Sequence, residues 1–162
     1  MAEVQEPKIN YEYERKFLLL RLPALKADVV AHIEQHYLDT NERIRRKSVE
    51  GEADVFYHTI KKNLRPGVNS EDEKKITREE YYSLLEKSKS FIVKKRYYYF
   101  IGEVRWEIDV FENMNLIVAE VEYPREDYVV NIPKFINNVI LLEVTHLREF
   151  SNKNISKKKL NY

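Results

Sequence analysis

Charged and uncharged residues alternate along several stretches of the chain. In residues 11–20, Glu12, Glu14 and Lys16 share one face when the stretch is read at a period of two. No Gly or Pro interrupts these residues, which favours a strand. Later stretches carry acidic pairs with the same spacing, and in two of them apolar residues fill the alternate positions. These pairs are Glu71 and Glu73, Glu107 and Asp109, and Glu120 and Glu122. The pattern predicts strands with one charged face.

Basic residues follow the same alternation at Arg43 and Arg45, at Lys61, and at Lys94 and Arg96. Like charges that face each other across a sheet destabilise it by up to about 1 kcal/mol per pair. If these faces enclose an interior, divalent cations would offset the carboxylates and a polyanion would offset the basic side chains. Oxygen ligands of this kind suit Mg²⁺ or Mn²⁺. Alternation alone does not decide whether the charged faces point inward or toward solvent.

The stretches between the predicted strands indicate connecting elements. Leu25, Val29, Val30 and Ile33 have helical spacing. Thr77 and Glu80 form a capping box. The expected elements are a helix over residues 23–37, a loop over residues 63–70, a helix over residues 77–89, and a short helix or loop over residues 133–142. For the tail, residues 148–162, two alternatives stay open: a helix folded back over one end of the sheet, or a frayed basic end.

Composition narrows the functional classes. The 28 basic and 27 acidic residues nearly cancel, so any anion site must be local. The chain has no Gly-x-x-x-x-Gly-Lys or Gly-x-Gly-x-x-Gly motif, which excludes nucleotide binding by those routes. It has no Cys, which excludes thiolate zinc sites and a Cys nucleophile. With a polar N-terminus and no long apolar run, we expect one cytoplasmic domain over residues 1–162.

An ordered set of motifs adds a family resemblance. Glu12-Tyr13-Glu14-Arg15-Lys16 resembles the Glu-x-Glu-x-Lys signature of the CYTH family, also called triphosphate tunnel metalloenzymes. The resemblance extends from Tyr11 to Ile155, although Asn69 stands where the family usually carries Arg before an acidic pair. The later landmarks, in family order, are Arg43-x-Arg45, Thr59-Ile60-Lys61, Glu71-x-Glu73, Lys94-x-Arg96-Tyr97, Glu107-x-Asp109, Glu120-x-Glu122 and Glu143-Val144-Thr145.

The resemblance implies an α+β fold: an eight-stranded antiparallel β tunnel, or barrel, with a charged lumen and a few flanking helices. It also implies a hydrolase that depends on Mg²⁺ or Mn²⁺ and attacks triphosphate substrates, with inorganic tripolyphosphate as the expected substrate. The expected partner is a triphosphate-containing small molecule, and we expect neither a membrane nor a nucleic acid partner. The oligomeric state is left open, with a homodimer as one option.

The same resemblance implies roles for individual residues. The implied metal ligands are Glu12, Glu14, Asp109, Glu120 and Glu122. The implied phosphate ligands are Lys16, Arg43, Arg45, Lys61, Lys94 and Arg96. Glu73, Glu107 and Asp109 are the implied catalytic groups, which would orient or activate a water.

Other substrates remain open on the same fold. Class IV adenylyl cyclases and thiamine triphosphatases share the tunnel, although the chain has no His-Phe-x-x-Pro motif of the cyclase type. Trp106 is the single Trp and lies on the strand face opposite Glu107, so the sequence identifies no aromatic clamp for an organic group. A third alternative is a non-enzymatic protein that binds polyphosphate or RNA 5′-triphosphate ends through the basic faces alone.

Overall fold

The computed structural model describes residues 10–158, which form nine antiparallel strands and a few short helices. The strands are β1 (Tyr11–Leu19), β2 (Val29–Asp39), β3 (Glu42–Val49), β4 (Val55–Arg65), β5 (Val68–Ile76), β6 (Ser90–Ile101), β7 (Val104–Phe111), β8 (Ile117–Tyr123) and β9 (Ile140–Glu143). The helices are α1 (Arg78–Leu85), α2 (Lys134–Asn137), the 3₁₀ helix η1 (Arg148–Phe150) and α3 (Asn152–Lys157).

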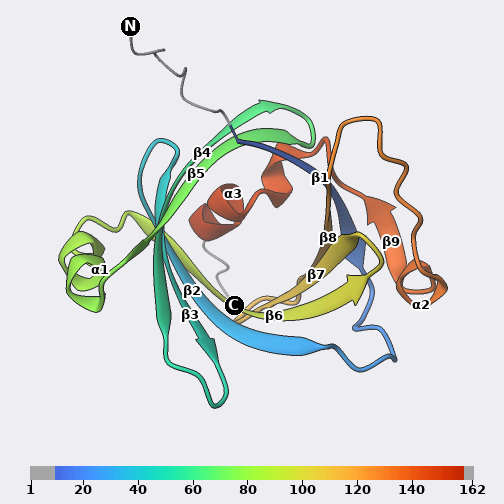
Figure 1. Cartoon of the computed structure of the whole chain (residues 1–162), viewed down its shortest axis with the longest axis horizontal. Coiled ribbons are helices and arrows are strands. Elements are labelled where there is room, and N and C mark those ends of the chain that lie inside the picture. The colour runs from blue at the N-terminus through green and yellow to red at the C-terminus, as the bar shows by residue number, and fades with distance from the viewer. Residues whose placement is uncertain (1–9, 159–162) are drawn as a thin grey trace, which may run out of the picture.

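Eight of the strands close into a ring (Figure 1). Their order is β5-β4-β3-β2-β6-β7-β8-β1, and the start of β1 pairs with β5 to complete the circuit. The end of β1 leaves β5 and pairs instead with β9, which is the ninth strand. The predicted α+β class and the eight-stranded antiparallel tunnel are therefore confirmed.

The apolar faces of the strands point outward and are covered from outside. Phe17, Trp106, Ile108 and Val121 are each at most 2% exposed, and they pack against Ile136 of α2. A smaller cluster on the other side of the ring packs β2, β3 and β4 against α1. Both helices lie outside the ring of strands (Figure 1). Because the apolar faces are buried against these covers, the alternate charged faces must line the interior.

The predicted helix over residues 23–37 is wrong. Val29–Asp39 forms β2, which pairs with β3 on one side and β6 on the other. A short apolar stretch fits both periods, and Val29, Ala31 and Ile33 also alternate as a strand requires. The β-branched residues here favour a strand once both neighbours supply backbone hydrogen bonds.

The expected loop over residues 63–70 is also wrong, because β4 and β5 extend to a tight turn at Pro66-Gly67. Gly67 has φ +75°, and a Cβ there would lie 2.6 Å from the backbone oxygen of Glu14. The Glu14 N–H donates to the Gly67 carbonyl at 2.9 Å. The turn is therefore docked on β1 beside Glu14, which is a position that only Gly fits.

Helices α1 and α2 lie where the sequence predicts them, but they are shorter than the predicted ranges. Thr77 Oγ1 accepts a hydrogen bond from the Glu80 N–H at 3.1 Å, as the capping box predicts, but α1 ends at Leu85. Residues 133–142 contain the short helix α2, followed by β9, which the sequence did not indicate. No helix in the described part of the chain has the length and apolar character needed to cross a lipid bilayer.

The C-terminal segment closes one end of the tunnel. Helix α3 lies within the outline of the ring (Figure 1) and contacts β6. Its Ile155 is 1% exposed and packs with Ile92, Phe111 and Val118. Of the two alternatives for the tail, the helix folded over one end is correct for the residues up to 158, and residues 159–162 lie outside the described range.

Candidate functional site

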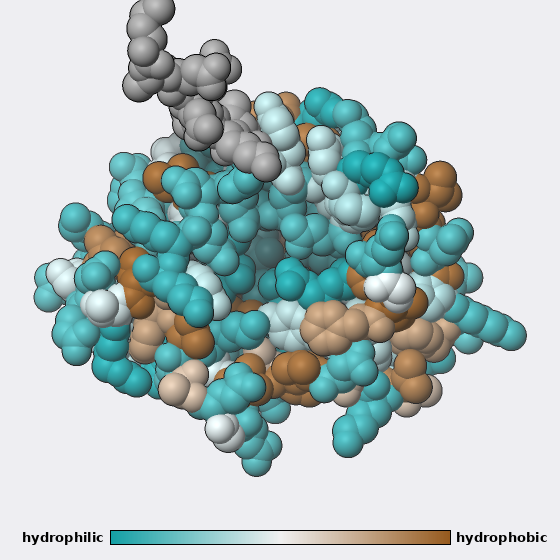
Figure 2. Space-filling view, in the orientation of Figure 1, coloured by the Kyte–Doolittle hydropathy of each residue, from teal (hydrophilic) through white to brown (hydrophobic). Residues whose placement is uncertain are grey.

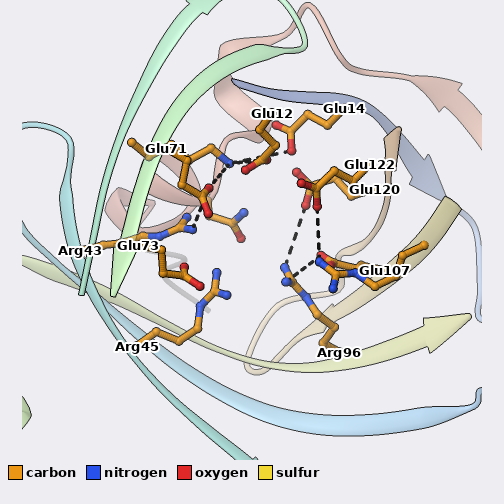
Figure 3. A pocket seen from close by; sticks show the side chains of 13 residues that line it. Glu12, Glu14, Arg43, Arg45, Glu71, Glu73, Arg96, Glu107, Glu120 and Glu122 are labelled. Atoms are coloured by element: carbon orange, nitrogen blue, oxygen red, sulfur yellow. Dashed lines mark hydrogen bonds and ion pairs between the residues drawn. The ribbon is translucent and has the colours of Figure 1, made fainter. Parts of the chain in front are cut away.

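The interior of the ring is a cavity lined almost entirely by charged side chains. Figure 2 shows a central hollow surrounded by hydrophilic residues, and Figure 3 shows the side chains that line it. Seven glutamates and five basic residues contribute, together with one residue from α3. The lining residues are Glu12, Glu14, Arg43, Arg45, Lys61, Glu71, Glu73, Arg96, Arg105, Glu107, Glu120, Glu122 and Asn152.

One wall, formed by β1 and β8, is acidic. Glu12 and Glu14 alternate along β1, and Glu14 is directly opposite Glu122 in the register with β8. The side chains of Glu12, Glu14 and Glu120 are only 12–14% exposed, whereas that of Glu122 is 45% exposed. Crowded, partly desolvated carboxylates of this kind leave a site for a cation.

The pKa values of this wall reflect the crowding. Burial and hydrogen bonding with Glu71 raise the pKa of Glu12. Burial and the nearby Glu14 carboxylate raise the pKa of Glu120. Burial, with the charges of Glu12 and Glu107, raises the pKa of Glu122 to about 7. The charged form of each of these three groups is therefore disfavoured in the absence of a neighbouring cation.

The opposite wall presents Arg43 and Arg45 from β3 (Figure 3). Arg45 donates from Nε and from an Nη to the Gln35 amide oxygen at 2.9 and 2.8 Å. Among residues 10–158 no carboxylate lies within ion-pair distance of Arg45. Burial, with the charges of Arg43 and Arg96, lowers the pKa of Arg45 to about 10. Arg45 is thus a partly buried cation that is hydrogen-bonded to an amide and not to a carboxylate.

Arg43 also has spare hydrogen-bonding capacity. Its Nε has no hydrogen-bond partner, and its closest carboxylate oxygen, on Glu71, is 3.9 Å away. A buried guanidinium donor without a partner is costly, so it indicates a missing acceptor. Two such guanidiniums side by side on one strand form a suitable surface for a multiply charged anion.

Lys61 and Arg96 form ion pairs with glutamates that line the cavity. Lys61 Nζ lies 2.9 Å from Glu12 and 3.8 Å from Glu14. Although burial opposes it, the charges of Glu14 and Glu12 raise the pKa of Lys61. Arg96 contacts Glu107 at 2.7 Å. Without a bound ion, these cations therefore balance part of the acidic charge.

Three of the predicted site residues lie below the cavity lining, toward α3. Lys94 Nζ donates to Asp109 at 2.7 Å and to the Asn152 side-chain oxygen at 2.9 Å. Lys16 Nζ donates to the Phe150 carbonyl at 3.2 Å and lies 3.7 Å from Glu120. Although burial opposes it, Arg96 and Lys94 hold the pKa of Asp109 well below its usual range. These contacts tie the C-terminal segment to the floor of the cavity.

The structure thus brings ten of the thirteen predicted site residues to the lining, and Lys16, Lys94 and Asp109 to the floor. Sequence reasoning missed Glu71, Arg105 and Asn152 as site residues. Glu71 was visible as half of an acidic pair, and Arg105 alternates with Glu107 on β7, so a strict period of two finds both. No sequence signal indicates Asn152, because only tertiary folding places α3 under the cavity.

The chemistry of the donors fits a hard divalent cation. Among residues 10–158 no three carboxylate or imidazole groups already stand in a metal-binding arrangement. Carboxylate oxygens of the acidic wall are engaged instead, by Lys61 and by the Asn69 amide, which donates to Glu14 at 3.2 Å. Glutamate oxygens with raised pKa values, held beside an anion site, are nevertheless the ligand type that Mg²⁺ and Mn²⁺ prefer.

The raised pKa of Glu122 leads to a prediction about pH. A carboxyl with a folded-state pKa of about 7 and an ordinary unfolded value binds more protons in the folded state. In metal-free buffer, its contribution to the free energy of unfolding should therefore decrease as pH rises from about 4.5 to about 7. Thermal melting with EDTA at several pH values should show this loss, and Glu122→Gln should reduce it. If the melting temperature of the variant falls with pH as steeply as that of the wild type, the raised pKa does not belong to Glu122.

No protein-family model matches the sequence, and no curated protein matches it. Solved structures are similar in fold. One is described as the inorganic triphosphatase NE1496, with 23% identity, a TM-score of 0.58, and coverage of 91% of this chain and 95% of that chain. The PH1819 protein from Pyrococcus horikoshii OT3 has 19% identity, a TM-score of 0.59, and coverage of 72% and 80%.

A putative adenylate cyclase from Bacillus halodurans has 13% identity, a TM-score of 0.50, and coverage of 72% of this chain and 82% of that chain. At these identities the likeness concerns the fold. The fold resemblance predicted from the ordered motifs is therefore confirmed.

Proposed function

We propose that this chain is a divalent-cation-dependent hydrolase of triphosphate compounds, with inorganic tripolyphosphate as the leading substrate. The observation that carries the proposal is the pair of opposed walls in an enclosed lumen. Arg43 and Arg45 have donors to spare, and four glutamates face them from β1 and β8. A linear triphosphate would supply negative charge to Arg43 and Arg45, and the cation bound to it would supply positive charge to the four glutamates. The fold shared with a structure described as an inorganic triphosphatase supports this proposal.

The basic residues would bind and orient the phosphate chain. Guanidinium groups suit bidentate contact with phosphate oxygens, and Lys61 supplies a point charge. In triphosphate hydrolysis the protein mainly positions the reacting groups and stabilises the negative charge that is spread over the phosphoryl oxygens. A tripolyphosphate on Arg43 and Arg45 would also release Lys61 from its carboxylate contacts.

The residues that would hold Mg²⁺ or Mn²⁺ are Glu12, Glu14, Glu120 and Glu122. When bound, the cation would supply charge neutralisation at phosphate oxygens and acidity toward water. The Asn69 amide holds the side chain of Glu14 through a hydrogen bond. The carbonyl of Gly67 accepts a hydrogen bond from the Glu14 N–H and so holds its backbone. The acidic wall is therefore built with its first strand held in place before the cation binds.

Glu73 and Glu107 are the proposed water-orienting groups. Glu73 accepts a hydrogen bond from Thr59 Oγ1 at 2.9 Å, and Glu107 contacts Arg96 and Arg105 at 2.7 Å each. Asp109, which the resemblance assigns to metal binding and catalysis, accepts hydrogen bonds from Lys94 and Arg96 at 2.7 to 2.9 Å. We assign Asp109 the role of holding these two cations, since both of its oxygens are engaged.

A phosphate-release assay tests the proposal. Tripolyphosphate, ATP and thiamine triphosphate are each supplied with Mg²⁺, with Mn²⁺, and with excess EDTA. We expect release from tripolyphosphate with either metal and none with EDTA. Full activity in EDTA would contradict the proposal. Tight calorimetric binding of tripolyphosphate with no product under any condition would show a non-enzymatic binder instead.

A further inference from the structure

Gln35 is a fully buried amide that lies beside Arg45. It is opposite Arg45 in the register of β2 with β3, and at 0% exposure it does not itself line the cavity. Its side-chain oxygen accepts hydrogen bonds from Arg45 Nε at 2.9 Å and from an Arg45 Nη at 2.8 Å. Its amide nitrogen donates to the hydroxyl of Tyr37, two residues along the same face of the strand. Both ends of the amide are therefore fixed.

This amide leaves Arg45 oriented and also fully charged. A guanidinium has five N–H groups, of which Gln35 accepts two, and the other three are left for acceptors in the cavity that Arg45 lines. A carboxylate in place of the amide would hold the guanidinium equally well, but its negative charge would neutralise the cation. Because the amide is neutral, it holds the side chain and leaves the positive charge to an incoming anion.

Other cations of the lumen have charged partners. Arg96 lies 2.7 Å from a carboxylate oxygen of Glu107, and Lys61 lies 2.9 Å from one of Glu12. Within the part of the chain that the structure describes, Arg45 has no carboxylate in ion-pair distance. A neutral hydrogen-bond partner therefore sets Arg45 apart from these two cations.

We propose that Gln35 is a positioning residue, which aims the Arg45 guanidinium at the phosphate chain without neutralising it. This inference rests on the proposed function, in which Arg45 binds a phosphate group. Fixing a long side chain before the ligand arrives lowers the entropic cost of binding. A change at Gln35 should therefore alter the binding of tripolyphosphate through Arg45, although Gln35 does not line the cavity.

Gln35→Glu tests the role of the neutral amide. The new carboxylate would accept the same two hydrogen bonds from Arg45, and the Tyr37 hydroxyl would donate to its other oxygen, so the fold should be kept. We expect a melting temperature at or above that of the wild type in anion-free buffer. We expect kcat/KM for tripolyphosphate to fall roughly tenfold to a hundredfold, the scale of one charge-assisted hydrogen bond.

The matched control is Asn137→Asp, which adds the same charge at an exposed position of α2, outside the ring. This control should keep the wild-type kcat/KM. A Gln35→Glu variant that also keeps it would overturn the inference.

A double-mutant cycle tests whether Gln35 acts through Arg45. Gln35→Met keeps the length of the side chain but removes its hydrogen bonds, and we expect it to lower kcat/KM roughly tenfold when Arg45 is present. In the Arg45→Met background the same change should lower kcat/KM less than about twofold further. Equal losses in the two backgrounds would overturn the inference, because Gln35 would then act on a group other than Arg45.

The two proposals can fail separately. If the wild-type chain binds tripolyphosphate in calorimetry but releases no phosphate with either metal, the proposed function is overturned. The same cycle, measured on the Kd for tripolyphosphate, then supports or overturns the role of Gln35 by the same criteria. A chain that neither binds nor cleaves tripolyphosphate overturns both proposals.

Discussion

Replacing Glu14 by Gln is expected to lower metal-dependent phosphate release from tripolyphosphate by at least about a hundredfold, the upper range for disturbing a metal's supporting groups. The substitution keeps the shape and the contact with Asn69 but removes one negative charge from the acidic wall. The cation would then bind weakly, and raising the Mn²⁺ concentration should restore part of the rate. Initial rates over a metal titration measure both effects.

The matched control for this prediction is Glu103→Gln. Glu103 is exposed in the turn between β6 and β7, so its charge lies outside the lumen. We expect the control to keep wild-type rates. If Glu14→Gln keeps more than half of the activity at limiting Mn²⁺, the acidic wall is not the cation site.

Replacing Arg45 by Met should have a similarly large effect on activity but little effect on stability. Loss of a donor to developing phosphate charge is expected to lower kcat/KM by about 10² to 10³. In anion-free buffer, the substitution removes a partly buried cation whose hydrogen bonds go to an amide and not to a carboxylate, which favours folding. It also leaves the buried Gln35 amide oxygen without these two hydrogen bonds, which opposes folding. We therefore expect a melting temperature close to that of the wild type.

Arg46→Met is the control, because Arg46 is the next residue on β3 and points to the other face. It donates to Asp54 at 2.8 Å outside the lumen. We expect this variant to keep its kcat/KM, and surface pairs of this kind contribute little to stability. A variant at Arg45 that unfolds more readily while retaining activity would contradict the assignment of Arg45 to the phosphate site.

Much of the site was predictable because it follows a period of two. Alternation along the sequence is enough to identify the charged positions of β1, β3, β7 and β8, and the same rule extends to Arg105. What alternation could not decide is which face is inside. That depends on α1 and α2, which cover the apolar faces from outside, and on the β1–β5 pairing that closes the ring.

The features that the sequence did not predict correctly all depend on tertiary contacts. Val29–Asp39 has an apolar pattern that fits a helix, and pairing with β3 and β6 selects the strand. β9 is a short strand that gains its partner only where β1 leaves β5. Lys16, Lys94 and Asp109 share the inward face with the lining residues, but the C-terminal segment, through Phe150 of η1 and Asn152 of α3, covers this end and leaves them at the floor.

An exchange of partners in the lumen would allow the proposed site to bind both a cation and an anion. In the structure, acids and bases neutralise each other incompletely, with Lys61 close to Glu12 and Arg45 without a carboxylate in ion-pair distance. An incoming triphosphate would offer oxygens to the basic residues, and its cation would offer positive charge to the glutamates. Each ligand should therefore strengthen the binding of the other, by an equal factor in both directions.

A crystal structure with tripolyphosphate and Mn²⁺ would locate both ligands. We expect an anomalous Mn²⁺ peak against Glu12, Glu14, Glu120 or Glu122, with phosphate groups on Arg43 and Arg45 inside the ring. Tripolyphosphate bound to the outer surface, or held in the lumen with no metal at the acidic wall, would contradict this expectation.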